Sequence, residues 1–276
     1  MTDYRTWKTA LSVSCFQPED FDNYQACGIE AIEISPSCKD FPTLDFPAIE
    51  KEAKRTGVHI WSLHLPFSRE IDISHPSSQK RRAALNTDLF YMEKAAAVGA
   101  EVVVVHPSSE PISENERQER LSNASSSLKI LADKAQELGI LLAVENLPRT
   151  CLTRNSHEML YLLTQDKRLR FCFDTNHLLE ENHAEFLKPC ADRLISLHIS
   201  DYDFINERHV MPGDGFIDWR QLVTLLEEAD YQGPLLFEVS LAGYHKADFE
   251  APSHSLSEIK SIHKNIKSIT GKGKRL

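Results

Sequence analysis

Residues 101–107 have the sequence EVVVVHP and residues 140–146 have the sequence ILLAVEN, and a helical pattern separates them. Both runs are short, almost wholly apolar before a polar end, and rich in Val, Ile and Leu. This composition is typical of parallel strands that are buried on both faces. In the intervening stretch 124–138 apolar residues recur with helical period, and Gly139 is a common kind of helix stop. The segment therefore predicts a strand–helix–strand unit.

The same alternation extends along the whole chain. Eight apolar runs occur, at 9–14, 31–35, 59–66, 101–107, 140–146, 170–174, 194–200 and 234–240. Helical patterns occur at 21–27, 88–98, 124–138, 219–229 and 255–269. Eight strands alternating with helices predict a single (β/α)8 TIM barrel, an α/β fold, covering residues 1–276 as one domain. The absence of G-x-G-x-x-G after the first run argues against a dinucleotide-binding open sheet. The basic stretch 267–276 is expected to be a flexible tail.

Composition limits the function classes. The 276 residues include 31 Lys+Arg and 41 Asp+Glu, a formal net charge of −10, with 41% hydrophobic residues. Such a balance is ordinary for a globular enzyme and argues against nucleic acid as the principal partner, because phosphate binding is supplied by Lys and Arg. The sequence has neither an apolar run of about 18 residues nor a signal-like N-terminus, and its six cysteines form no C-x-x-C pair. We expect a cytoplasmic protein without a membrane partner.

Polar residues end six consecutive predicted strands. From the third strand to the eighth they are His64, His106, Glu145, Asp174, His198 and Glu238. Active sites of such barrels lie at the C-terminal ends of the strands, so these side chains should converge. Carboxylates and imidazoles are costly to bury unless they are paired or bind a cation. Glu145, Asp174, His198 and Glu238 form a mixed nitrogen and oxygen set that suits Mn, Zn, Co or Fe(II), and they predict a divalent-metal site.

Seven segments stand out along the chain: LHLPF at 63–67, VVVVHP at 102–107, LAVEN at 142–146, FDTNH at 173–177, LHISD at 197–201, HVMPGDGFIDW at 209–219 and LLFEVS at 235–240. In this order and spacing they resemble the xylose-isomerase-like superfamily of divalent-metal barrels, and within it the sugar phosphate isomerase/epimerase group. The resemblance covers nearly the whole chain.

The resemblance implies a reaction and roles for particular residues. One divalent metal (Mn, Zn or Co) would be held by Glu145, Asp174, His198 and Glu238, and the two glutamates would move the substrate proton. The implied enzyme is an isomerase or epimerase of a small ketose, hydroxy-carbonyl compound or polyol, acting through a metal-stabilised enediolate. His177 and Arg208 lie where the family contacts its substrate. Glu33, in the second apolar run, is a further substrate-binding candidate, with pairing to a neighbour as the alternative.

Endonuclease-IV-type enzymes share this architecture and use a trinuclear zinc site with nine ligands. The matching positions are His64, His106, Glu145, Asp174, His177, His198, Glu207, His209 and Glu238. Eight agree in type, and Glu207 replaces an expected Asp, so the number of metals is open between one and three. Three alternatives follow: a phosphodiester hydrolase that cleaves abasic DNA, a related metal-dependent lyase or dehydratase, and a barrel that binds a sugar without catalysis. Assembly into a homo-oligomer is also left open.

Overall fold

The computed structural model describes residues 7–14, 17 and 20–239. The expected helix 255–269 and the expected tail 267–276 lie outside these residues. The strands are β1 (Thr9–Val13), β2 (Ala31–Ile34), β3 (His59–His64), β4 (Val102–Val105), β5 (Leu141–Glu145), β6 (Arg170–Asp174), β7 (Leu194–His198) and β8 (Leu235–Phe237).

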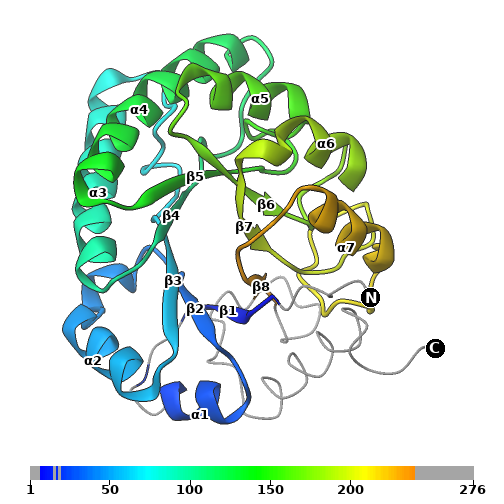
Figure 1. Ribbon diagram of the computed structural model, residues 1–276. Coiled ribbons are helices and arrows are strands. Elements are labelled where there is room, and N and C mark those ends of the chain that lie inside the picture. Colours follow the sequence, from blue (N-terminus) through cyan, green and yellow to red (C-terminus); the bar gives the residue numbers. More distant parts are fainter. Residues whose placement is uncertain (1–6, 15–16, 18–19, 240–276) are drawn as a thin grey trace.

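The eight strands form a barrel in chain order (Figure 1). Each strand from β1 to β6 pairs in parallel with the next, and β8 pairs in parallel with β1. The barrel closes just beyond the end of β7, where Ile199 pairs with Phe237, the last residue of β8. The backbone N–H of Ile199 donates to the carbonyl of Leu236 at 2.8 Å, and its carbonyl accepts from the N–H of Glu238 at 3.0 Å. The prediction of a (β/α)8 barrel is confirmed.

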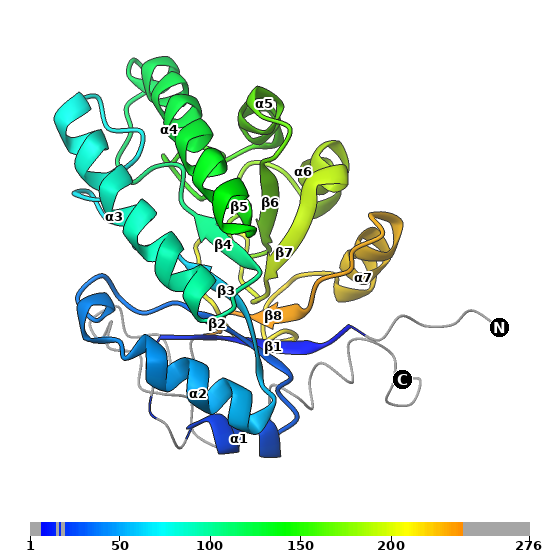
Figure 2. The same cartoon turned by 60° about the vertical axis from the view of Figure 1, so that its left-hand side comes forward.

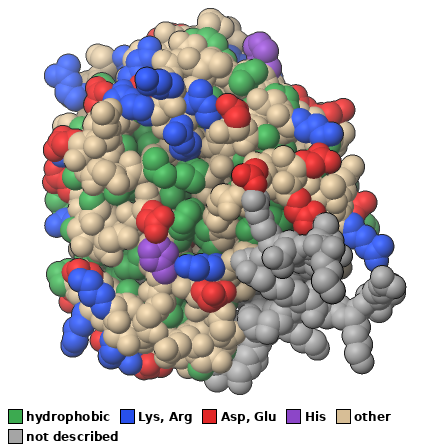
Figure 3. All heavy atoms as spheres, in the orientation of Figure 1, with side chains coloured by type: hydrophobic (Ala, Val, Ile, Leu, Met, Phe, Trp, Pro, Cys, Tyr) green, Lys and Arg blue, Asp and Glu red, His purple; other side chains and the backbone are tan. Residues whose placement is uncertain are grey.

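Helices cover the outside of the strands (Figure 2). They are α1 (Asp20–Ala26), α2 (Phe46–Thr56), α3 (Ser78–Ala97), α4 (Arg117–Leu138), α5 (Ser156–Gln165), α6 (His183–Cys190) and α7 (Trp219–Glu228), with short 3-10 helices at η1 (Phe41–Thr43) and η2 (Ala191–Arg193). On the face shown in Figure 3, hydrophobic side chains gather toward the centre, and charged side chains of both signs surround them. Among the described helices, none is long and apolar enough to cross a bilayer.

Two helices begin earlier than the sequence pattern indicates. The apolar period predicts a helix at 88–98, whereas α3 begins at Ser78. The first ten residues of α3 contain one buried residue, Ala84, so this part of the helix shows no apolar period. The pattern likewise places the start of the next helix at 124, seven residues after the observed start of α4 at Arg117. Arg117 is buried although it is charged, so a search for buried apolar residues does not detect this first turn of α4.

The inside of the barrel is filled by side chains on the N-terminal side of the strand ends. Trp61, three residues before the end of β3, packs against two small apolar clusters. These clusters consist of Val102, Val104, Ala143 and Cys172, and of Ala10, Ala31 and Leu236. The indole Nε1 of Trp61 donates to Oγ of Ser196 at 3.1 Å. The packed interior therefore forms a floor beneath the polar residues at the strand ends.

Candidate metal centre

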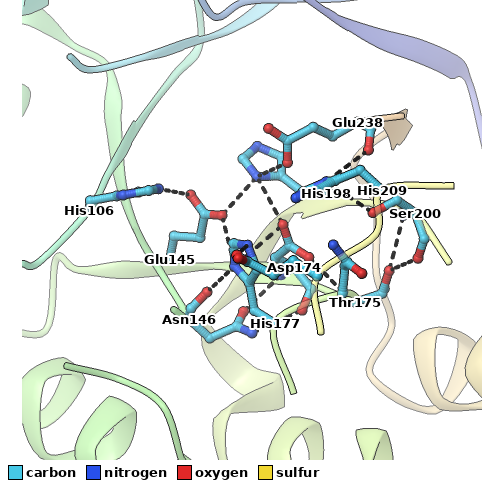
Figure 4. Close-up of polar contacts among 12 residues, drawn as sticks. His106, Glu145, Asn146, Asp174, Thr175, His177, His198, Ser200, His209 and Glu238 are labelled. Atoms are coloured by element: carbon cyan, nitrogen blue, oxygen red, sulfur yellow. Dashed lines mark hydrogen bonds and ion pairs between the residues drawn. The ribbon is translucent and has the colours of Figure 1, made fainter. Parts of the chain in front are cut away.

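Four of the predicted site residues meet at the C-terminal end of the barrel (Figure 4). Glu145, Asp174 and His198 are the last residues of β5, β6 and β7, and Glu238 directly follows β8. One potential ligand atom of each lies within 4.8 Å of those of the other three. The first three side chains are buried, whereas that of Glu238 is 29% exposed. Three of the four side chains are therefore shielded from solvent, which reaches the group at Glu238.

One ring nitrogen of His198 faces three carboxylates. Its Nδ1 lies 3.1 Å from Oε1 of Glu145, 3.3 Å from Oε2 of Glu238 and 3.9 Å from Oδ2 of Asp174. Burial lowers the pKa of His198, but the negative groups around the ring outweigh it and raise that pKa well above its usual value. Such a concentration of negative charge around one nitrogen favours a cation.

The chemistry of the four residues fits a divalent metal. Oδ2 of Asp174 is buried and has no hydrogen-bond partner. Burial raises the pKa of Asp174 well above its usual value, and His177 only partly opposes this effect. A buried carboxylate oxygen without a hydrogen bond is costly, and a bound cation would reduce that cost. Three carboxylates and one imidazole form the mixed donor set that Mn, Zn, Co or Fe(II) accepts.

Asn146 fixes the direction of Asp174. Its Oδ1 accepts from the backbone N–H of Asp174 at 2.8 Å, and its Nδ2 donates to the carbonyl of Asp174 at 2.9 Å. Oδ1 of Asp174 accepts from the backbone N–H of Asn176 at 2.6 Å. With the backbone held and one carboxylate oxygen engaged, Oδ2 is left to face the site.

Glu33 lies behind His198. It is 0% exposed, and it accepts hydrogen bonds from Oγ of Ser12 at 3.2 Å and Oγ of Ser62 at 2.7 Å. Its Oε1 lies 3.1 Å from Nε2 of His198. Its contacts are thus with neighbouring side chains inside the barrel, at the ring nitrogen that does not face the three carboxylates.

A second group shares Glu145 with the first. His64 and His106 each place Nε2 near Oε2 of Glu145, at 3.0 and 3.1 Å, and the three residues form a possible ligand set. Burial raises the pKa of Glu145, but His198 and His106 outweigh it and hold that pKa well below its usual value. The ring of Phe67, 44% exposed, lies over His106 with centroids 3.7 Å apart, so an aromatic surface borders this group.

The third group consists of His177, Glu207 and His209. Nε2 of His177 lies 2.9 Å from Oε1 of Glu207, and Nδ1 donates to the carbonyl of Asn146 at 2.8 Å. Burial lowers the pKa of His177, but Asp174 and Glu207 raise it to about 10. Burial raises the pKa of Glu207, but the contact with His177 and the Arg149 guanidinium lower it to about 2. All nine residues matched to the nine-ligand pattern thus fall into three groups.

Two arginines, Arg208 and Arg149, lie at the border of the site. Arg208 forms an ion pair with Asp203, with Nη2 2.7 Å from Oδ2, and its backbone N–H donates to Asn176. Arg149 pairs with Glu207 and with Glu110, and the sequence analysis did not single it out. Its position could have identified it, because it lies four residues after the strand-end Glu145, in the loop that borders the site.

A family model described as the xylose isomerase-like TIM barrel matches residues 21–261. The chain belongs to this family. It is 29% identical over 187 residues to the uncharacterized protein MJ1311 of Methanocaldococcus jannaschii, a match that covers 64% of this chain and 63% of that relative. It is 24% identical over 230 residues to the D-psicose 3-epimerase of Enterocloster bolteae, covering 79% of this chain and 74% of the relative.

Solved structures agree with this assignment at the level of the fold. The crystal structure of a D-tagatose 3-epimerase-like protein superimposes with a TM-score of 0.77 at 22% identity, covering 95% of this chain and 98% of the other. The family model confirms the xylose isomerase-like prediction from the strand-end segments.

Proposed function

We propose that the protein is a divalent-metal-dependent sugar epimerase or isomerase that acts on a ketose or a related hydroxy-carbonyl compound. The observation that carries this proposal is the convergence of Glu145, Asp174, His198 and Glu238, with ligand atoms within 4.8 Å of one another. The likeness to a D-psicose 3-epimerase and to a D-tagatose 3-epimerase-like protein supports the substrate class. Manganese, cobalt and zinc all suit this donor set.

A divalent cation held by these four residues would polarise a substrate carbonyl and stabilise the negative charge of an enediolate. Glu145 and Glu238 come from β5 and β8, which are separated in the barrel by β6 and β7. The two carboxylates therefore approach the site from different sides. One removes the proton from a carbon next to the carbonyl, and the other returns a proton to the opposite face, which inverts that carbon. Return to the neighbouring carbon would instead give an isomer.

Two further residues contribute to substrate binding in this proposal. His177 is buried beside Asp174 and its Nδ1 donates to the carbonyl of Asn146, so a substrate oxygen would replace Glu207 as the partner of Nε2. Arg208, on the loop after β7, contacts the outer part of the substrate. The packed floor around Trp61 closes the site on the inner side of the barrel and excludes water there.

The test is turnover in deuterated water. The metal-loaded protein is incubated with a panel of ketoses that includes D-psicose, D-tagatose and D-fructose, and products are followed by NMR. We expect an epimer or an isomer with one solvent deuteron at the reacting carbon, and loss of turnover when a chelator removes the metal. Turnover that is unchanged after metal removal, or no product from any sugar in the panel, would contradict the proposal.

A second candidate is a phosphodiester hydrolase of the endonuclease-IV type. The observation in its favour is that the nine matched residues form three groups, two of which share Glu145. The net charge of −10 argues against it, because phosphate binding depends on Lys and Arg. Zinc-loaded protein on a duplex with one abasic site separates the two candidates, since strand cleavage at that site is expected only from the hydrolase.

A further inference from the structure

The third group differs from the other two in carrying a fixed positive charge. The carboxylates of Glu145, Asp174 and Glu238 pair with histidines. Glu207, in contrast, pairs with the guanidinium of Arg149 as well as with His177. The third group therefore has a cation bound to its carboxylate before any metal ion arrives.

Arg149 is held in this place from its other side. Its Nη2 and Nε lie 2.6 and 2.9 Å from Oε1 of Glu110, while Nη1 contacts Oε2 of Glu207. Glu110 belongs to the loop after β4, Arg149 to the loop after β5 and Glu207 to the loop after β7. The guanidinium thus connects three loops through its planar set of donors, a geometry that lysine does not reproduce.

Contacts already occupy the atoms of Glu207 and His177 that could bind a metal. Oε1 of Glu207 contacts Nε2 of His177 and Oε2 contacts Arg149, so both carboxylate oxygens are engaged. Nδ1 of His177 is engaged by the carbonyl of Asn146. A metal ion in this group would have to break these contacts and would lie beside a guanidinium of like charge.

We propose that Arg149 takes the place of a metal ion at His177, Glu207 and His209, and so limits the chain to the ions bound through Glu145. In this role Arg149 is a specificity-determining residue, because a neutral sugar oxygen can replace Glu207 at Nε2 of His177 without adding a second positive charge beside the guanidinium, whereas a metal ion cannot. The inference rests on the proposed metal-dependent function, because it assumes that the group formed by Glu145, Asp174, His198 and Glu238 is the one that binds the ion.

The test counts zinc ions per chain. Full-length protein without a histidine tag is stripped with a chelator, equilibrated with excess Zn²⁺, desalted and measured by elemental analysis. We expect Arg149→Met to bind one zinc more than the wild type, since the methionine keeps apolar bulk and removes the charge. Adding His209→Ala to this variant should return the count to the wild-type value. Co²⁺ absorption spectra of the same variants report the added site independently.

Two controls make the count decisive. Arg154→Met removes another arginine of the same loop, one that pairs with Glu114 and Glu180, and its count should equal that of the wild type. His209→Ala in the wild-type background should also leave the count unchanged. A loss of one zinc in that variant would overturn the inference even if Arg149→Met failed to fold, and an unchanged count in folded Arg149→Met would overturn it as well.

Failure of the proposed function gives a different result. In that case Asp174→Asn has the same metal content as the wild type, or the metal-loaded protein shows no turnover of any sugar. The difference in count between the wild type and Arg149→Met does not depend on turnover.

Discussion

Oε1 of Glu33 lies 3.1 Å from Nε2 of His198, at the ring nitrogen that does not face the candidate metal centre. Glu33 is in turn fixed by Ser12 and Ser62. Metal-binding histidines commonly donate their second ring N–H to a carboxylate, which fixes the tautomer and raises the basicity of the nitrogen that binds the metal. The pair therefore turns Nδ1 of His198 toward the three carboxylates.

Replacing Glu33 should weaken metal binding without removing a ligand. We expect Glu33→Gln to raise the dissociation constant for Zn²⁺ by about 10- to 100-fold, the range typical for such supporting carboxylates. The measurement is competition with a chromophoric chelator. Ser62→Ala is the matched control, because it removes one hydrogen bond to Glu33 and keeps the carboxylate; its effect should be much smaller. Equal zinc affinity in Glu33→Gln and the wild type would show that Glu33 does not support His198.

Glu238 is expected to be required for turnover. We predict that Glu238→Gln lowers kcat by about 10²-fold or more, the usual loss for a group that transfers a proton. Its side chain is 29% exposed, so the isosteric amide should leave the fold intact, which circular dichroism can check. Glu93→Gln, an exposed position on α3, is the control for a general effect of losing one carboxylate. A Glu238→Gln variant with wild-type kcat would remove this residue from the mechanism.

Metal binding should release protons. The pKa values of Asp174 and His198 are both raised well above their usual values in the metal-free chain, and both groups must lose their protons to act as ligands. A raised pKa means that protons compete with the metal up to a higher pH, so zinc affinity should increase as the pH rises from 6 to 8. Calorimetric titrations in buffers of different ionisation enthalpy measure the number released. We expect at least one proton per ion at pH 7, and a value of zero would contradict the site.

The loop that carries Glu207 and His209 should tolerate no side chain at Gly215. A Cβ atom there would lie 2.3 Å from Oδ1 of Asp201 and 2.5 Å from the carbonyl of Tyr202. Asp201 is the acceptor that organises this loop, with bonds from the backbone N–H of Gly213 at 2.8 Å and from Nε1 of Trp219 at 2.8 Å.

We therefore expect Gly215→Ala to lower the free energy of unfolding by about 1–3 kcal/mol, as overpacking does in well-packed regions. Urea denaturation measures the difference. Phe216→Ala, at a neighbouring side chain that is 75% exposed, should change the stability by less than about 0.5 kcal/mol. Equal unfolding curves for Gly215→Ala and the wild type would show that the loop moves away from Asp201 at little cost.

The barrel was predictable because its strands are buried on both faces. Val102–Val105 is buried at every position, so β4 appears in the sequence as an unbroken apolar run. The ligands were predictable for a related reason. Each of Glu145, Asp174 and His198 is the last residue of a strand, and the parallel arrangement brings those ends together. Periodicity and chain order therefore contain most of the information needed for the four-residue group.

The contacts made by the loops were not predictable in the same way. Arg149 and Glu207 are 58 residues apart in the sequence, and no period relates them. Whether Glu33 faces a substrate or a histidine depends on the face of β2 that its side chain occupies and on its depth in the barrel. A short apolar run in the sequence defines neither. The early starts of α3 and α4 were missed for a different reason, because their first turns are rich in polar residues.

The shared position of Glu145 has a thermodynamic consequence. Its Oε1 faces His198 and its Oε2 faces His64 and His106, so two ions bound to these groups would divide one negative charge. An ion in either group reduces the charge available to the other, and the affinities become coupled. By linkage the coupling free energy is the same in both directions. Metal titration of this protein should therefore show negative cooperativity instead of independent, equivalent sites.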